Sequence, residues 1–419
     1  MPSKPLRIFF SAGEPSGDLH GANLIRQLRA CCGQFEAVGY GGPRMQQAGC
    51  RLHHDMTALA VMWLGRALLH VLTFARLFML ADRYFRRSRP DALVLIDYPG
   101  FNWWLARRAK AHGIPVIYYL PPQLWAWAPW RVHKMRRLAD HVLCGLPFEE
   151  AWFREHGCNA MFVGHPFFDE VRQHPYDEAF VAERQSQPGP LVTILPGSRT
   201  QEVEANFPWL RKAAEQVVAQ VPDVRFAVAA FQPEQAEWVR RQLADSGLPV
   251  EVYVERTPEL IRAAACCMAV SGSVCLELLY HTKPSTILYH ISPLAYFVQG
   301  LFRKVKYITL VNLLTTDELH PADLSPFHPS QPDAAKVLFP EYLTCEDESG
   351  QIAAHVVEWL SDAARRDAVV GELERLKAEI SHGGASAHAA DYILAALSPA
   401  QPAAPALKPP HFRPNAVRK

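Results

Sequence analysis

An aspartate and an arginine each stand just beyond an apolar run that has the length of a buried strand. Asp97 directly follows the run 92–96, and Arg199 follows the run 190–195 after a Pro-Gly turn and Ser198. Open α/β sheets bind ligands at the carboxyl ends of their strands, so we predict that both side chains face a ligand. The carboxylate suits general-base work on a hydroxyl, and the guanidinium fork suits phosphate oxygens.

Each of these residues also has an alternative role. Asp97 could cap the turn that follows it, and Arg199 could be a solvated surface arginine. His20, at the start of the first helix, is a second candidate base. It ranks below Asp97 because a lone histidine is more often structural.

A second phosphate-type turn, Ser271-Gly272-Ser273, follows the apolar run 266–270 at a point where a helix begins. Small residues at a helix N-terminus present free N–H groups and the positive end of the helix dipole to an anion. Glu277, one turn further on, could accept hydrogen bonds from ribose hydroxyls, or it could be an ordinary helix glutamate. Two such turns in one half of the chain predict a uridine-diphosphate site there.

The first half opens with a different turn, GEPSGDLHGANL at 13–24, whose glycines are spaced four apart. A dinucleotide fingerprint needs G-x-G-x-x-G, and a phosphate loop needs G-x-x-x-x-G-K-[ST]. This turn has neither spacing, and its two acids, Glu14 and Asp18, would repel a pyrophosphate. We therefore expect a ligand of lower charge at this turn.

Short β-rich apolar runs that alternate with helical stretches predict the elements that hold these residues. Such a pattern indicates parallel sheets covered on both faces, so we predict an α/β protein with two Rossmann-like doubly wound domains facing a cleft. The proline-rich stretch 165–190 has no strand pattern and marks the junction between them. The expected strands are 6–10, 35–40, 92–96, 114–119, 141–144, 160–163, 190–195, 224–230, 249–254, 266–270 and 285–290.

The composition argues against several classes of protein. The chain has 419 residues, 49% of them hydrophobic, and a net charge of +1, which provides no global field for nucleic acid. Its nine cysteines include no CxxC pair, so we expect a reducing cytoplasm. The sequence has no D-x-D and no His/Asp/Glu cluster at ligand spacing, so we predict neither a metal nor another cofactor. The N-terminal apolar stretch is too short for a signal peptide and is interpreted as a strand.

The longest apolar stretch, 67–81, is too short to span a bilayer, which takes roughly 20 residues. It predicts a helix with a wide apolar face, followed by the basic stretch 82–90. One interpretation is a helix that faces the core of an α/β layer. The other is an interfacial helix that touches anionic lipid through Trp63, Phe74, Phe78, Arg83, Arg86 and Arg87.

Eight motifs occur along the chain in order: SAGEPSGDLHGANLI, GYGGPRMQQAGC, IDYPGFN, PPQLWAWAPWRVHKM, LPFE, VGHPFFD, LPGSRTQEV and SGSVCLELL. Over roughly residues 6 to 314 they resemble the lipid-A-disaccharide synthase family, and FPEYLT at 339–344 continues the likeness. The resemblance implies a glycosyltransferase type B fold and an inverting reaction without a metal. It implies transfer of diacylglucosamine from UDP-2,3-diacylglucosamine, by a β-1,6 bond, to 2,3-diacylglucosamine 1-phosphate.

Residue by residue, the resemblance implies that Asp97 deprotonates the acceptor 6-hydroxyl and that Arg199 binds the pyrophosphate. It assigns the acidic opening turn to the acceptor side, where carboxylates and a hydroxyl can hold sugar hydroxyls. The donor side includes Asn312 in VNLL, which can belong to the other subunit of a homodimer. The implied acceptor contacts are Glu14, Ser16 and Asp18, and the implied donor contacts are Ser198, Ser271, Gly272, Ser273, Glu277 and Asn312.

The resemblance also implies roles for the domains and a location at the cytoplasmic face of the inner membrane, without a spanning segment. The predicted divisions are 1–168 for an acceptor and membrane-facing domain, 169–370 for a UDP-sugar-binding domain, 371–398 for helices that pack back across the domains or onto a partner subunit, and 399–419 for a disordered tail. Alternatives are a UDP-N-acetylglucosamine 2-epimerase-like enzyme and a catalytically silent nucleotide-sugar-binding protein. The apolar, aromatic first half argues against the epimerase, and the presence of both Asp97 and Arg199 argues against a silent protein.

Overall fold

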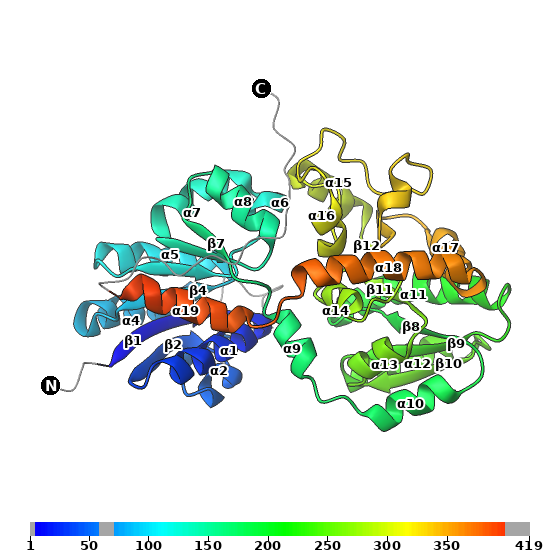
Figure 1. Cartoon of the computed structure of the whole chain (residues 1–419), viewed down its shortest axis with the longest axis horizontal. Helices are drawn as coiled ribbons and strands as arrows, with labels where there is room; N and C mark the ends of the chain where they lie inside the picture. The colour runs from blue at the N-terminus through cyan, green and yellow to red at the C-terminus, as the bar shows by residue number, and fades with distance from the viewer. Residues whose placement is uncertain (1–4, 58–70, 399–419) are drawn as a thin grey trace. The chain divides into compact units, whose positions relative to one another are not determined.

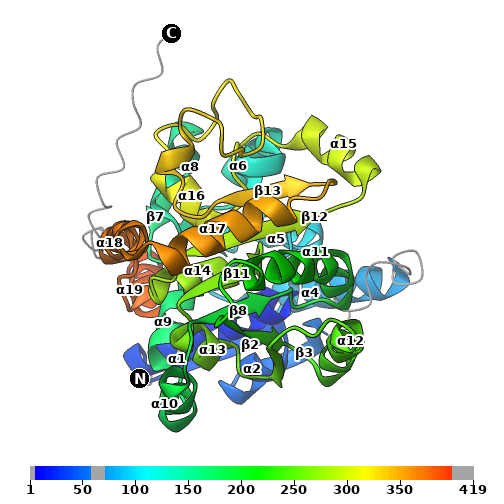
Figure 2. The same cartoon turned by 90° about the vertical axis from the view of Figure 1, so that its right-hand side faces the viewer.

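The computed structural model describes residues 5–57 and 71–398, and it consists of two compact units (Figure 1). Unit 1 runs to Glu170 and resumes at His382, whereas unit 2 runs from Val171 to Ser381. Each unit is built on one parallel sheet with helices on both faces, which Figure 2 shows from a second side. The prediction of an α/β protein with two doubly wound sheets is therefore confirmed.

Unit 1 has a seven-stranded parallel sheet in the order β3-β2-β1-β4-β5-β6-β7. Its central strands are continuous apolar runs because both faces of the sheet are covered. Gly39 is required in β2, since its φ is +142° and a Cβ there would lie 2.0 Å from the carbonyl oxygen of Phe10 in β1. The strands are β1 (Leu6–Ala12), β2 (Phe35–Gly41), β3 (Arg51–Asp55), β4 (Ala92–Ile96), β5 (Val116–Tyr119), β6 (His141–Cys144) and β7 (Ala160–Phe162).

The helices of unit 1 come from both ends of the chain. The last one, α19 (Ala385–Leu397), packs against the first, α1 (Pro15–Cys31), and Figure 1 shows the red helix beside the blue one. Ile393 of α19 is fully buried in the same core as Ile25 of α1. The others are α2 (Pro43–Gln47), α4 (Val71–Ser88), α5 (Pro99–Ala111), α6 (Leu124–Trp127), α7 (Val132–Leu138) and α8 (Pro147–Glu155), and α9 (Phe167–Gln173) leads into unit 2.

Unit 2 has a six-stranded parallel sheet in the order β10-β9-β8-β11-β12-β13. Its strands are β8 (Leu191–Leu195), β9 (Arg225–Ala230), β10 (Val250–Val254), β11 (Cys266–Val270), β12 (Ser285–His290) and β13 (Glu341–Thr344). Its helices are α10 (Glu178–Ser186), α11 (Thr200–Val218), α12 (Pro233–Leu243), α13 (Thr257–Ala263), α14 (Val274–Tyr280), α15 (Pro293–Phe302), α16 (Leu310–Thr315), α17 (Ser349–Ser361) and α18 (Ala363–Ile380).

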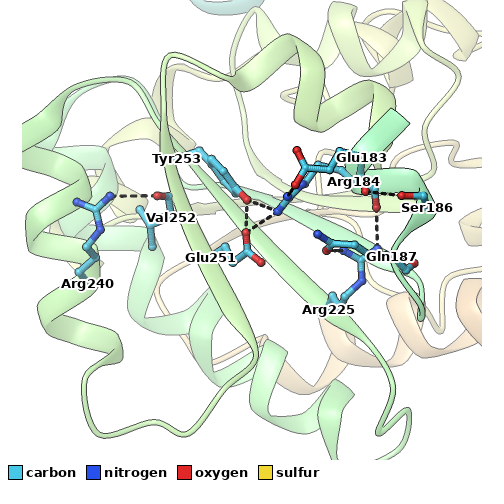
Figure 3. A network of polar contacts seen from close by, with 9 residues as sticks. All are labelled: Glu183, Arg184, Ser186, Gln187, Arg225, Arg240, Glu251, Val252 and Tyr253. Carbon is cyan, nitrogen blue, oxygen red and sulfur yellow. Dashed lines mark hydrogen bonds and ion pairs between the residues drawn. The ribbon is translucent and has the colours of Figure 1, made fainter. Parts of the chain in front are cut away.

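A polar network holds α10 against the edge of this sheet (Figure 3). The Arg184 guanidinium donates to the carboxylate of Glu251 at 2.7 Å and to the hydroxyl of Tyr253 at 2.6 Å, both on β10. Its carbonyl oxygen accepts a hydrogen bond from Arg225 of β9 at 2.9 Å. Because Arg184 is largely buried, these partners compensate for the loss of water around its charge.

The eleven strands expected from the sequence all occur, with ends that differ by at most two residues. Two further strands, β3 and β13, were not expected. β3 has the sequence RLHHD, which lacks an apolar run because it is a polar edge strand. β13 is the four-residue strand EYLT, which pairs with β12 and is likewise an edge strand, at the end of the second sheet.

Candidate active site

The turn after β4 has an unusual backbone. Asp97 and Tyr98 both have left-handed conformations, with φ of +50° and +45°, before α5 begins at Pro99. Such conformations cost non-glycine residues on the order of 1–3 kcal/mol each and persist only where surrounding contacts hold them. Here the carbonyl oxygen of Asp97 accepts hydrogen bonds at 2.7 Å from both the Asn102 amide and the Tyr118 hydroxyl.

Asn102 is completely buried and is itself fixed by β1. Its Oδ1 accepts a hydrogen bond from the Ser11 hydroxyl at 2.7 Å, and its Nδ2 also lies 3.3 Å from the carbonyl oxygen of Ile96. The amide therefore links the ends of β1 and β4 to the strained turn. This arrangement fixes the position from which the Asp97 side chain projects.

The carboxyl group of Asp97 is strongly perturbed. Burial and, to a smaller extent, the neighbouring charge of Glu14 raise its pKa to about 6, and the Tyr98 backbone N–H opposes the shift. The turns that carry Glu14 and Asp97 are packed together, because a Cβ at Gly13 would lie 2.3 Å from Cγ of Tyr98. An aspartate with this pKa is ionised near neutral pH and is a better proton acceptor than an ordinary one.

The other residues of the opening turn have different surroundings. Ser16 is exposed at the start of α1. Asp18 is buried, and its carboxylate accepts hydrogen bonds from the backbone N–H groups of three residues at the start of α2, at 2.7, 3.0 and 3.0 Å. The geometry of Asp18 is that of a group that fixes α2 against α1.

His20, the second candidate base, is a poor proton acceptor in this structure. Burial lowers its pKa to about 3, and its ring lies edge-on to that of His165, with the ring centroids 6.1 Å apart. A histidine with this pKa stays neutral at physiological pH and binds a proton weakly. The geometry and the electrostatics both favour Asp97.

A second carboxyl group, the buried Glu149 of the LPFE motif, lies near Asp97. It accepts hydrogen bonds from Nε1 of Trp125 at 3.1 Å and from the backbone N–H of Leu146 at 3.2 Å. Burial raises its pKa to about 7, and the charge of Asp97 adds to the shift. Sequence reasoning did not identify Glu149 as a site residue, although its motif was part of the family resemblance.

In unit 2, Arg199 stands at the N-terminus of α11, just beyond the carboxyl end of β8. Its side chain is 73% exposed and makes an ion pair with Glu202 at 3.0 Å. The same glutamate accepts hydrogen bonds from the backbone N–H groups of Ser198 and Arg199 at 3.2 Å each. The turn is thus fixed by Glu202, while the guanidinium remains accessible to a ligand.

The second phosphate-type turn lies between β11 and α14. Gly272 and Ser273 are exposed, and Ser271 is half-buried with its N–H bonded to the carbonyl oxygen of Leu288 at 3.3 Å. Glu277 is buried one turn into α14. Burial raises its pKa to about 7, and the charge of Glu259 adds to the shift.

The side chain of Asn312, in contrast, forms its hydrogen bonds within unit 2. It is buried in α16, and its amide nitrogen donates to the carbonyl oxygen of Phe339 at 2.7 Å and to Glu341 at 2.8 Å. Its Oδ1 accepts a hydrogen bond from the Phe339 N–H at 3.1 Å. These contacts connect α16 to β13 and to Phe339, which lies just before this strand.

The helix considered for membrane contact has two different faces. One face of α4 is buried in the core through Leu77, Ala81 and Phe85. On the other side Leu72, Met79 and Leu80 are exposed, and the exposed arginines at 83, 86 and 87 follow them.

The two phenylalanines considered for lipid contact pack against α5. The ring centroids of the half-buried Phe74 and of Phe101 are 5.6 Å apart, and those of Phe78 and Trp104 are 6.4 Å apart. Trp63 lies outside the described residues.

Residues 5–57 and 71–398 contain neither a metal-binding cluster nor a membrane-spanning helix. No group of three or more His, Cys, Asp or Glu side chains in that part of the chain could hold a metal ion. No helix within it is long and apolar enough to cross a membrane.

Comparison of the sequence with known families and proteins gave consistent results. A family model described as lipid-A-disaccharide synthetase matches residues 8–363. The lipid-A-disaccharide synthase of Geobacter sulfurreducens is 33% identical over 392 residues, which cover 93% of this chain and 97% of that protein. The enzyme of the same name from Alkalilimnicola ehrlichii is 35% identical over 319 residues, which cover 75% of this chain and 84% of that protein.

Solved structures show similarity in fold at low sequence identity. A UDP-N-acetylglucosamine 2-epimerase from Listeria monocytogenes has a TM-score of 0.61 at 11% identity, covering 94% of this chain and 96% of that one. The calicheamicin glycosyltransferase CalG4 has a TM-score of 0.55 at 13% identity, covering 94% and 98%. The architecture is therefore shared by glycosyltransferases and epimerases, and it does not separate the two activities.

Proposed function

Because the chain belongs to the lipid-A-disaccharide synthase family, we propose that Asp97 is the general base of its reaction and that Arg199 stabilises the leaving group. The protein is a glycosyltransferase of lipid A biosynthesis that uses a UDP-linked sugar. It transfers diacylglucosamine from UDP-2,3-diacylglucosamine to 2,3-diacylglucosamine 1-phosphate, forms a β-1,6 bond and releases UDP.

The observation that carries the assignment of the base is the strained turn at the end of β4. It fixes a half-buried carboxyl group with a pKa of about 6 at the carboxyl end of a central strand. In the reaction, Asp97 takes the proton of the acceptor 6-hydroxyl as that oxygen bonds to the anomeric carbon of the donor. The bond from this carbon to UDP breaks, and UDP leaves with the electron pair.

On the donor side, Arg199 meets the charge that develops on the pyrophosphate as the bond breaks. Its exposed guanidinium, on a turn that Glu202 holds in place, supports this role. Ser198 and the exposed turn 271–273 are further donor contacts, and Glu277 bonds a ribose hydroxyl. Asn312 supports the donor side through its contacts with β13 rather than through direct binding.

On the acceptor side, Glu14 and Ser16 hold sugar hydroxyls, and Glu14 also keeps the pKa of Asp97 high. Asp18 contributes indirectly by fixing α2. We further propose that the protein acts as a homodimer at the cytoplasmic face of the inner membrane, where α4 contacts the lipid surface. The exposed apolar and basic residues of α4 support the membrane contact.

An assay of UDP release tests the function. The purified protein is incubated with UDP-2,3-diacylglucosamine, with and without 2,3-diacylglucosamine 1-phosphate, and the sugar products are identified by mass spectrometry. We expect UDP release and a disaccharide 1-phosphate only when the acceptor is present. A 2-epimer formed without acceptor would indicate the epimerase alternative, and binding without any turnover would indicate a silent protein.

A further inference from the structure

The helix α15 of unit 2 exposes an apolar face that no described segment buries. None of its ten residues is buried. Five large apolar side chains are exposed, namely Leu294 at 74%, Phe297 at 66%, Val298 at 43%, Leu301 at 59% and Phe302 at 49%. At 3.6 residues per turn they fall within an arc of about 140°, so they form one continuous apolar stripe.

The orientation of α15 is the reverse of that expected for a surface helix. Its more polar side chains, Tyr296 and Gln299, lie on the opposite side and are half-buried. A surface helix of a globular protein normally turns its apolar stripe to the core and its polar face to water. Here the apolar stripe faces outward, an arrangement that favours a nonaqueous environment.

The helix is firmly attached to unit 2, so the exposure does not arise from a frayed segment. At its N-terminus, the Ser292 hydroxyl accepts a hydrogen bond from the Ala295 N–H at 3.3 Å. At its C-terminus, the buried Arg303 donates to the carbonyl oxygens of Lys306 at 2.9 Å and Leu324 at 2.5 Å. The stripe is therefore presented in a fixed position.

We propose that α15 is a bilayer-contacting helix of the UDP-sugar unit, distinct from α4, and that its apolar stripe inserts into the lipid interface. The stripe has the one-sided apolar face of helices that lie in a membrane interface. Residues 291–316 contain three cations and no acidic residue, which suits an anionic lipid surface. The choice of a bilayer as the partner rests on the lipid substrates of the proposed function.

A second copy of the chain is the less suitable partner for this face. A stable interface needs about 800 Å² and 20–30 residues from each partner, whereas α15 is a helix of ten residues, about 15 Å long. Insertion into lipid has no such requirement, because each apolar side chain transfers independently from water.

Vesicle binding without any substrate tests the inference. The double variant Phe297→Ser, Leu301→Ser is compared with wild type by flotation on phosphatidylethanolamine/phosphatidylglycerol vesicles, at about 0.5 M salt so that binding through the arginines of α4 is screened. We expect the partition coefficient to fall at least about tenfold for each side chain. The matched control is Phe231→Ser, which removes an exposed phenylalanine outside α15 and should leave binding unchanged.

Two further measurements make the outcome decisive. The amide hydrogens of 293–302 in the wild-type protein should exchange more slowly when vesicles are added, which does not depend on whether the variant folds. UDP release from detergent-dispersed substrates should persist in the double variant, and its loss there would count against a role of α15 that is limited to lipid contact. Absence of UDP release by the wild-type protein would instead count against the proposed function. Unchanged vesicle binding and unchanged exchange would overturn the inference. So would a shift from dimer to monomer with vesicle binding intact, or a raised KM for the dispersed donor with vesicle binding intact.

Discussion

Burial raises the pKa of Asp97 to about 6, from 3.8 for an ordinary aspartate. The folded protein therefore keeps a proton on this group at pH values where the unfolded chain has lost it. Stability falls as pH rises between these two pKa values, and above pH 6 the folded state carries a poorly solvated charge. The site thus holds a carboxylate of raised basicity at a cost in stability.

This conflict leads to a prediction for Asp97→Asn. The variant should lose about 10²–10⁴ in kcat, the usual contribution of a positioned base, yet its melting temperature at pH 8 should exceed that of wild type. The gain should shrink at pH 5, where the wild-type carboxyl group is mostly protonated. Calorimetry at both pH values and the UDP assay measure these effects. Asp391→Asn, an exposed carboxylate of the same unit, is the control and should change neither quantity.

The wild-type pH profile should agree with this assignment. Since the base must be deprotonated, kcat/KM should rise with pH through about 6 and level off above it. A profile that shows no such rise, or near-normal turnover by the asparagine variant, would move the base to another residue.

Arg199 yields a second prediction at the same scale. Charge develops on UDP in the transition state, so Arg199→Ala should lower kcat/KM. The loss should correspond to roughly 2.7–4 kcal/mol of transition-state stabilisation, as for loss of one preorganised donor. Arg199→Lys should restore little, because the planar fork is lost. Neither change should alter the melting temperature much, since the side chain is 73% exposed. Arg211→Ala, in the same helix, should be near-neutral, and full activity of the lysine variant would disprove a bidentate contact.

The sequence alone could place Asp97 and Arg199 at strand ends, because strand runs and their turns are local patterns. It could not show that Asn102, Tyr118 and Ser11 hold the strained turn, because those contacts join residues up to 91 positions apart. Asp18 illustrates the same limit. Its acidity is visible in the sequence, but its bonds to the start of α2 are not.

At the scale of elements, α4 has both of the faces on which the two interpretations from the sequence rest. Its Leu77, Ala81 and Phe85 belong to the core, as a helix of an α/β layer requires, while its exposed face carries apolar side chains and then arginines. Helix periodicity could predict both faces, but only the packing decides which face is covered.

The arginines of α4 should make vesicle binding depend on salt. Each is worth about 1 kcal/mol near an anionic surface, and the effect fades as salt rises. Glutamates at Arg83, Arg86 and Arg87 should therefore weaken binding to anionic vesicles at low salt and spare activity on detergent-dispersed substrate. A control with glutamates at Arg211, Arg240 and Arg241 has the same change in charge. Binding that responds equally to both sets would contradict a specific role for α4.

Most of the strands predicted from the sequence are buried apolar runs, and the edge strand β10 was also predicted, from its valine-rich VEVYV sequence. β3 was missed because an edge strand needs no apolar run, and the RLHHD sequence exposes alternate residues. β13 was missed because its EYLT sequence is not an apolar run and follows a long stretch without regular structure. Both lie at sheet edges, where the hydrophobic pattern is weakest.

At the scale of the whole molecule, unit 1 depends on a helix from the far end of the chain. Ile393 of α19 is fully buried among residues of α1 and the first sheet. Ile393→Ala should therefore lower the unfolding free energy of unit 1 by about 2–5 kcal/mol, seen as a lower melting temperature in one of two transitions. Leu72→Ala, an 82% exposed position in the same unit, should stay within about 0.5 kcal/mol. Equal effects of the two changes would contradict this role of α19.

Because α19 packs against α1, the contact also determines the order in which the two units can fold during synthesis. Residues 15–31 emerge early, but their helical partner at 385–397 is synthesised last. At about 5–20 residues per second, α1 waits roughly 20–70 s for it, while residues 171–381 of unit 2 are already complete. Unit 1, whose first helix is made early, is therefore the last unit to complete its core. The apolar surface of α1 that α19 covers stays exposed during that interval and must be protected from aggregation.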